Sequence, residues 1–116
     1  MQINIDYRFT SLNDYISAER ANRYAAAKIK ETETEIARLS ALNKSNRTLV
    51  YPVDINCTWF RKDARTDPDN ISFGIKFILD GFVKAGLLKG DNWKFIKHIG
   101  HGFEISNYDY VIVDID

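Results

Sequence analysis

The sequence has little of several features, and each shortage narrows the possible class of protein. It contains a single cysteine, Cys57, so no disulfide can form within the chain and a reducing, cytoplasmic setting is expected. No apolar run approaches the roughly 18 residues that cross a bilayer, so no membrane association is expected. The opening residues, MQINIDYRF, lack the basic and apolar segments of a signal peptide.

The chain also lacks a net charge, since 16 basic residues balance 16 acidic ones. A protein that holds nucleic acid by bulk charge alone is usually basic, so this balance weakens a nucleic-acid function without excluding it. The charge is uneven, because basic residues gather at positions 20–30 and 61–97 and none follows Lys97. A bound divalent cation would offset some of the carboxylates.

What is present is the composition of one globular domain covering residues 1–116, with 45% hydrophobic residues and enough length for a core. Periodicity predicts strands at residues 3–9, 53–59, 93–99 and 108–115, and helices at 18–42 and 71–85. SLND, at residues 11–14, is predicted to be a turn. The expected fold class is therefore α/β (α+β), with one mixed sheet packed against two main helices.

The first predicted helix carries an apolar stripe and a set of basic residues beside it. The expected stripe is Ala21, Ala25, Ile29, Thr32, Ile36 and Leu39. Arg20, Arg23 and Lys30 lie off this stripe and form either a solvated face or a surface that meets phosphates. Cys57, among alternating apolar residues, is expected to be a buried structural cysteine.

The segment TDPDN, at residues 66–70, allows two interpretations. Pro68 favours an extended Asp67, and Asp69 or Asn70 can accept a hydrogen bond from the first free N–H groups of the next helix. Alternatively, Asp67 and Asp69 are two apart in an extended stretch, so both carboxylates can face the same way and hold Mg²⁺ or Mn²⁺. A third acid, Asp91, follows the helix and is taken to return to this site.

The second predicted helix has two further features. Lys76, Asp80 and Lys84 recur at i, i+4 positions, which indicates a surface salt-bridge ladder or, at Lys76, a phosphate contact. Phe73 and Phe77 fall away from its main apolar stripe. We expect these two rings to pack under another element or against a second subunit.

The run DPDNISFGIKFILDGFVKAGLLKGD resembles the signature of the RusA-like Holliday junction resolvases, common in bacteria and their phages. The matching residues, in order, are Asp67, Asp69, Asn70, Lys76, Asp80, Ala85, Gly86 and Asp91. The resemblance extends upstream to SLNDYISAERANRY and to Pro52, which leads into a strand that ends in an aromatic pair, and so covers most of the chain.

The resemblance implies a Mg²⁺-dependent endonuclease, with Mn²⁺ as a possible substitute, that acts as a homodimer on four-way DNA junctions. Asp67, Asp69 and Asp91 would be the metal-binding acids, and Lys76 would contact or polarise phosphate as a fourth catalytic residue. Asn70 would shape the loop and cap the helix, and Asp80 would orient Lys76. The residues expected to contact DNA are Arg20, Arg23, Lys30, Arg61, Lys62, Arg65 and Lys84.

Two alternatives remain open. Gly90 stands where the family often has an acid, which allows a dimeric junction-binding protein of phage origin that cleaves weakly. A small structural domain, in which TDPDN only caps a helix, is the other. The enzyme requires Asp67, Asp69 and Asp91 to cluster, whereas the structural domain predicts that Asp91 is remote.

Overall fold

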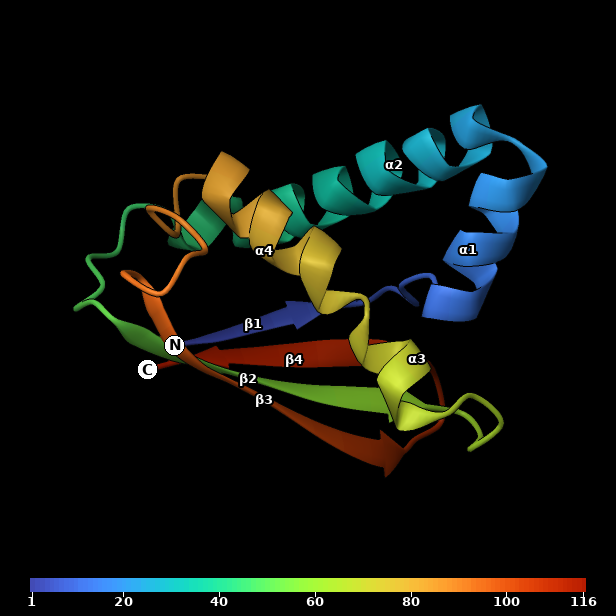
Figure 1. Cartoon of the computed structure of the whole chain (residues 1–116). Helices are drawn as coiled ribbons and strands as arrows, with labels where there is room; N and C mark the ends of the chain where they lie inside the picture. Colours follow the sequence, from blue (N-terminus) through green and yellow to red (C-terminus); the bar gives the residue numbers. More distant parts are fainter.

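A computed structural model describes all 116 residues of the chain, and it contains one mixed sheet with helices on one side (Figure 1). The strands are β1 (Gln2–Ile5), β2 (Val53–Arg61), β3 (Ile96–Ile105) and β4 (Tyr110–Ile115). The helices are α1 (Leu12–Ala21), α2 (Arg23–Ala41), the 3-10 helix η1 (Leu42–Lys44), α3 (Pro68–Ser72) and α4 (Ile75–Lys84). The predicted fold class, an α+β mixed sheet packed against helices, is confirmed.

The sheet has the order β1-β4-β2-β3, and only the β2–β3 pair is parallel. Val53 pairs with Ile96 at one end of this pair, and Arg61 pairs with Ile105 at the other. The long crossover from β2 to β3 carries α3 and α4 over one face of the sheet. Because the two strands run the same way, whatever follows β2 lies at the opposite end of the sheet from whatever precedes β3.

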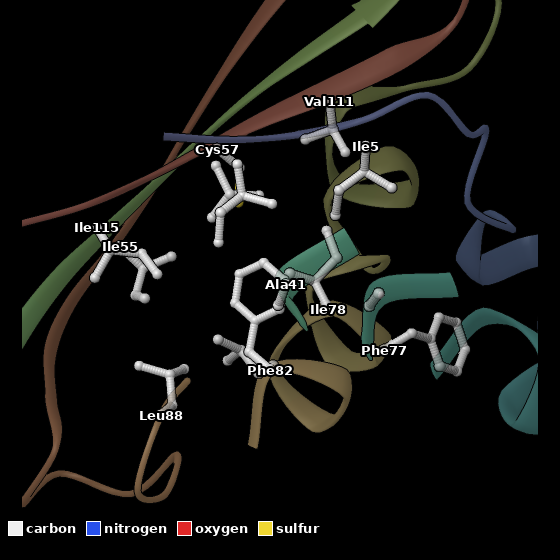
Figure 2. Close-up of a cluster of buried hydrophobic side chains, with 14 of the residues drawn as sticks. Ile5, Ala41, Ile55, Cys57, Phe77, Ile78, Phe82, Leu88, Val111 and Ile115 are labelled. Carbon is white, nitrogen blue, oxygen red and sulfur yellow. The ribbon is translucent and has the colours of Figure 1, made fainter. Parts of the chain in front are cut away.

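The core lies between this face of the sheet and helices α2 and α4 (Figure 2). Ile55 and Cys57 of β2 are covered by Ile78 and Phe82 of α4, and all four side chains are fully or almost fully buried. Cys57 is the buried structural cysteine that the sequence predicted. Its burial, with a smaller effect of Asp114, raises the pKa of the thiol to about 12, so it is not a reactive nucleophile.

The N-terminal third differs from the prediction at the end of β1, at SLND, and in the first predicted helix. β1 ends at Ile5 and not at Phe9. The segment that follows is held against α2, because Tyr7 and Thr10 donate hydrogen bonds to the buried carboxylate of Glu33. SLND is not a turn: Ser11 caps α1, accepting a hydrogen bond from the backbone of Asp14 at 3.2 Å.

The single helix predicted at residues 18–42 is two helices that meet at Asn22. This residue is extended, with φ −167° and ψ 118°, and its side chain caps α2 by accepting from Tyr24 N at 2.8 Å. Asn is a strong N-cap residue, so the local signal for the break was present inside a pattern that otherwise reads as continuous.

The predicted apolar stripe of this helix is only partly right: Ile29 and Ile36 are half-buried against the core, but the fully buried face is a different one. The buried residues of α2 are Ala26, Glu33, Thr34, Ala37 and Ala41, whereas Ala21, Ala25 and Leu39 are exposed. A Cβ on Gly81 of α4 would lie 2.5 Å from the Cβ of Ala37, so α2 approaches α4 through its small residues. Close helix approach, rather than side-chain size, decides which face is buried.

The second predicted helix, residues 71–85, is divided into α3 and α4 around Gly74. A Cβ on Gly74 would lie 2.8 Å from Phe9 Cβ and 2.9 Å from the ring of Trp59, so the backbone here passes directly over two core aromatics. Gly86 ends the crossover helix with φ +79°, as predicted for a C-terminal stop. β3 begins later than predicted and runs on to Ile105.

Candidate functional site

The TDPDN segment lies at the end of β2, where Asp67 occupies the N-cap position of α3. Its backbone is extended, with φ −67° and ψ 149°, as Pro68 requires, but its side chain makes no capping hydrogen bond. Asp67 and Asp69 are both exposed, and no salt bridge or side-chain hydrogen bond involves either carboxylate. Two oxygen-donor groups are therefore left free at one helix N-terminus.

The predicted capping role of Asn70 is not observed. Its Oδ1 instead accepts a hydrogen bond from the backbone N–H of Asn13, at 3.1 Å, and so ties α3 to the start of α1. The predicted contribution of Asn70 to the shape of the loop remains, but it acts between two helices. Asp69 likewise caps nothing with its carboxylate; only its carbonyl oxygen accepts, from Ser72 Oγ at 3.2 Å.

Lys76 and Asp80 form the predicted i, i+4 pair on α4, with 3.5 Å between Nζ and Oδ1. The lysine side chain is 57% exposed, so the pair is weak in energy but it directs the ammonium group along the helix surface. Lys84 does not extend this pair into a ladder. It lines a groove between α2 and α4, together with Lys30, Asp80 and Asp91.

Asp91 lies in the loop between α4 and β3, at the end of the sheet where β3 begins. Asp67 and Asp69 lie at the end where β2 and β3 finish (Figure 1). The ten residues of β3 separate these ends by roughly 30 Å. Within one chain, no group of three or more His, Cys, Asp or Glu side chains is placed to hold a metal ion.

The donor set at TDPDN nevertheless suits a hard cation. Carboxylate oxygens are the ligands that Mg²⁺ takes, and it commonly binds through one or two carboxylates and keeps several waters. Asp67 and Asp69 supply two such groups without competing partners. The predicted extended stretch is not formed, however: Asp67 is extended, but Asp69 lies in the first turn of α3, so strand alternation does not turn the two carboxylates the same way. Asp91, which the sequence assigned to the same site, is not brought to it by the fold of a single chain, because the crossover through α3 and α4 carries the chain to the opposite end of the sheet.

The residues expected to contact DNA fall into three places. Arg20 and Arg23 lie at the corner between α1 and α2, and Lys30 and Lys84 lie in the α2–α4 groove beside Asp91. Lys62 and Arg65 are exposed in the loop after β2, close in sequence to Asp67. Of these positions, the loop after β2 places basic groups nearest to the free carboxylates.

Arg61 differs from the other basic residues because it is 7% exposed and is the last residue of β2. Its Nη2 atom is buried without a hydrogen-bond partner. Burial, and then the nearby charge of Arg8, lower the pKa of the guanidinium, against opposing effects of Asp109 and Asp63. Arg61 lines a cavity under α3. The sequence could have predicted that it faces inward, because side chains two apart in a strand lie on the same face and Trp59 is buried.

Phe73 and Phe77 pack against another element of the same chain, the first of the two predicted possibilities. Their rings lie 5.3 Å and 5.7 Å from that of Tyr15 on α1, and Phe77 is fully buried. They hold α1 against the α3–α4 crossover, next to the hydrogen bond made by Asn70. The Phe77 ring is therefore used entirely within the chain, and the Phe73 ring is half-buried.

Sequence reasoning missed two residues that the fold makes prominent. Glu33 is buried in α2 and accepts hydrogen bonds from Tyr7 and Thr10. Burial, and then the charge of Glu33 and its hydrogen bond with Tyr7, raise the pKa of Tyr7 to about 12. Trp93, in the loop before β3, is 94% exposed. No local pattern marks either one, because each departs from the usual burial of its residue type.

No protein-family model and no curated protein matches the chain. No helix combines the length and the apolar character needed to cross a bilayer.

Proposed function

We propose that the chain is a Mg²⁺-dependent, structure-selective endonuclease of the RusA-like kind, which acts in the cytoplasm on four-way DNA junctions. The observation that carries this proposal is the free state of the Asp67 and Asp69 carboxylates. A segment that served only to cap α3 would use the side chain of Asp67, Asp69 or Asn70 for this purpose, and none of the three does so. Two unpaired acids next to the exposed Lys62 and Arg65 suit a metal ion held against a phosphate.

The position of Asp91 leads us to propose that the metal site is completed by a second copy of the chain. β3 is an edge strand with only β2 as a neighbour, and ten residues of its backbone are open on the other side. A two-fold axis across the middle of β3 would exchange its ends. Asp91 of one chain would then come to the end where Asp67 and Asp69 of the other chain lie.

The expected roles follow from this arrangement. Mg²⁺, when bound by these carboxylates, lowers the pKa of a bound water and polarises a phosphoryl oxygen. Lys76 pairs with Asp80, one turn further from α3, so its ammonium group would leave this pair to reach a phosphate held at Asp67 and Asp69. There it would stabilise negative charge that develops during hydrolysis. Lys62 and Arg65 hold the phosphate backbone without reading its sequence. Two sites related by a two-fold axis match the symmetry of a four-way junction.

The second candidate, a junction-binding protein that cleaves weakly, is favoured by Gly90. A Cβ at this position would lie 2.7 Å from the ring of Phe95, so an acidic side chain cannot be added without moving that ring. The site then has Asp91 alone at the closing turn. This candidate keeps the dimer and the basic groups but predicts tight binding without efficient hydrolysis.

The proposal is tested by a nicking assay on a synthetic four-way junction and on a linear duplex of matched sequence, with Mg²⁺ and with EDTA. We expect paired nicks in the junction, dependent on Mg²⁺. Asp69→Asn should abolish them and keep or strengthen junction binding, because one negative charge near the phosphates is removed. Asp14→Asn, a change at an exposed acid in the first turn of α1, is the matched control and should cut normally.

The possible outcomes separate the candidates. Equal cutting by Asp69→Asn and the native chain would show that TDPDN holds no catalytic metal. Tight junction binding without cutting would favour the second candidate. If the chain neither binds nor cuts the junction, TDPDN is only the start of a helix.

A further inference from the structure

Trp93 is the most exposed large apolar side chain of the protein, at 94%. It lies in the loop between α4 and β3 and lines a shallow hollow with Ile96 and Lys97 at the start of β3. Leaving a whole indole in water forgoes the burial of about 150–250 Å² that a tryptophan ordinarily contributes to a core or an interface. A position of this kind is typical of an interface residue.

A line of exposed apolar residues continues from Trp93 along β3. Ile99 and Phe103 are 43% and 39% exposed, and Ile105 is 66% exposed at the far end of the strand. These residues pair with Ile55, Trp59 and Arg61 of β2, so they lie on the face of the sheet that carries the helices. Their partners in β2 are buried, whereas these side chains of β3 remain partly open to solvent.

The strip ends in a cavity of about 240 Å³ between α3 and the ends of β2 and β3. Its walls are half apolar and also contain the buried Arg61, whose Nη2 has no partner. The lining residues used below are Trp59, Arg61, Asp63, Phe103, Glu104 and Ile105. The chain thus carries an exposed indole at one end of β3 and an open, partly apolar cavity at the other.

We propose that Trp93 of each chain enters this cavity in a second copy, in a two-fold symmetric dimer that pairs the two β3 edges antiparallel. The inference rests on the dimer of the proposed function and names its contact residues. If position 99 of one strand opposes position 99 of the other, position 96, where β3 begins, opposes position 102, and the turn at residues 93–95 lies towards the last residues of the partner's β3. The indole of one chain then lies beside Ile105 and the mouth of the cavity in its partner.

Charge supports this antiparallel arrangement. The start of β3 is flanked by Lys94 and Lys97, and the cavity at its end by Asp63 and Glu104. A two-fold axis near the middle of the strand brings the lysines of one chain to the acids of the other. A parallel arrangement would place the lysines together and the acids together, which is unfavourable.

The lining also explains why the occupant is an indole and not an anion. The lining contains two acids, Asp63 and Glu104, and one base, Arg61, so its net charge is negative and it repels a phosphate or a carboxylate. An aromatic face is attracted to a guanidinium without adding a negative charge. Trp93 of a partner therefore matches both the apolar walls and the unpartnered guanidinium of Arg61.

The test measures molecular mass and the environment of Trp93 in the full chain. Protein labelled with 5-fluorotryptophan has two fluorine resonances, one for each tryptophan, and Trp93→Phe assigns them. On concentration, the mass from light scattering should rise from monomer to dimer, and the Trp93 resonance should shift in parallel. Trp93→Ala and Ile105→Lys should each raise the dissociation constant at least about tenfold. Tyr24→Ala, at an aromatic residue of α2 that is 74% exposed, is the matched control and should leave it unchanged.

Three results would overturn the inference. They are a Trp93→Ala protein that dimerises like the native chain, a dimer whose Trp93 resonance does not move, and a native chain that stays monomeric up to about 1 mM. The outcome is separable from that of the proposed function. If Trp93→Ala still dimerises and still nicks the junction, the Trp93 contact is refuted and the proposed function stands. If the dimer forms through Trp93 but makes no Mg²⁺-dependent nicks, the proposed function is refuted and the Trp93 contact stands.

Discussion

If the metal site takes Asp67 and Asp69 from one chain and Asp91 from its partner, two inactive variants should restore each other. Asp69→Asn and Asp91→Asn each remove one metal ligand from both sites of their homodimer. Loss of a ligand removes several kcal/mol of transition-state stabilisation, so each homodimer should nick at least about 100-fold more slowly than the native protein.

A heterodimer of the two variants behaves differently because the substitutions are distributed unequally. One site receives both substitutions, and the other combines the intact Asp67 and Asp69 of the Asp91→Asn chain with the intact Asp91 of the Asp69→Asn chain. One site of two remains, so the heterodimer should nick at about half the native rate. It should make single nicks and not paired ones.

The assay uses the two variants co-expressed with different affinity tags, so that the heterodimer is isolated from both homodimers. A heterodimer of Asp69→Asn with the native chain is the control, since it retains one intact site whether the site lies within one chain or between two. If the control nicks and the doubly substituted heterodimer is as inactive as its parents, the shared site is refuted. Asp91 would then have to reach Asp67 and Asp69 within one chain.

Two further predictions concern stability. Gly81→Ala should lower the free energy of unfolding by about 2 kcal/mol. The added Cβ would meet Ala37 Cβ and the backbone of Thr34 and Arg38 within 2.7 Å, so the overpacking cost lies near the top of about 1–3 kcal/mol, and alanine returns about 1 through helix propensity. Urea denaturation measures this, and an unchanged midpoint would mean that the helices separate freely. The second is a loss of stability as pH falls below about 6.5. His101 Nδ1 accepts from Trp59 Nε1 at 3.0 Å, and burial lowers the pKa of the imidazole, so its contribution is present above the unfolded-state pKa and is lost as the pH falls through the folded-state value. Thermal unfolding of the native chain and of His101→Gln at several pH values checks this; equal pH dependence would exclude His101 as the source.

Much of the fold was predictable because local signals decided it. The alternation of Val53, Ile55, Cys57 and Trp59 predicted the central strand, and Gly86 predicted the end of the crossover helix. The breaks at Asn22 and Gly74 were missed, because a helical period continues through both positions. At Gly74 the cause is a tertiary contact with Phe9 and Trp59, which no local pattern contains.

In the candidate site, too, one part was predictable from the sequence and another part was not. Asp67 and Asp69 flank Pro68, which keeps Asp67 extended, so the sequence by itself determined that two carboxylates would stand at the start of a helix. The sequence had placed both in an extended stretch, whereas the structure places Asp69 inside α3. Where Asp91 lies was decided only by the tertiary structure. The parallel pairing of β2 and β3 carries the chain the length of the sheet between these acids, and a parallel crossover cannot return to the end from which it began.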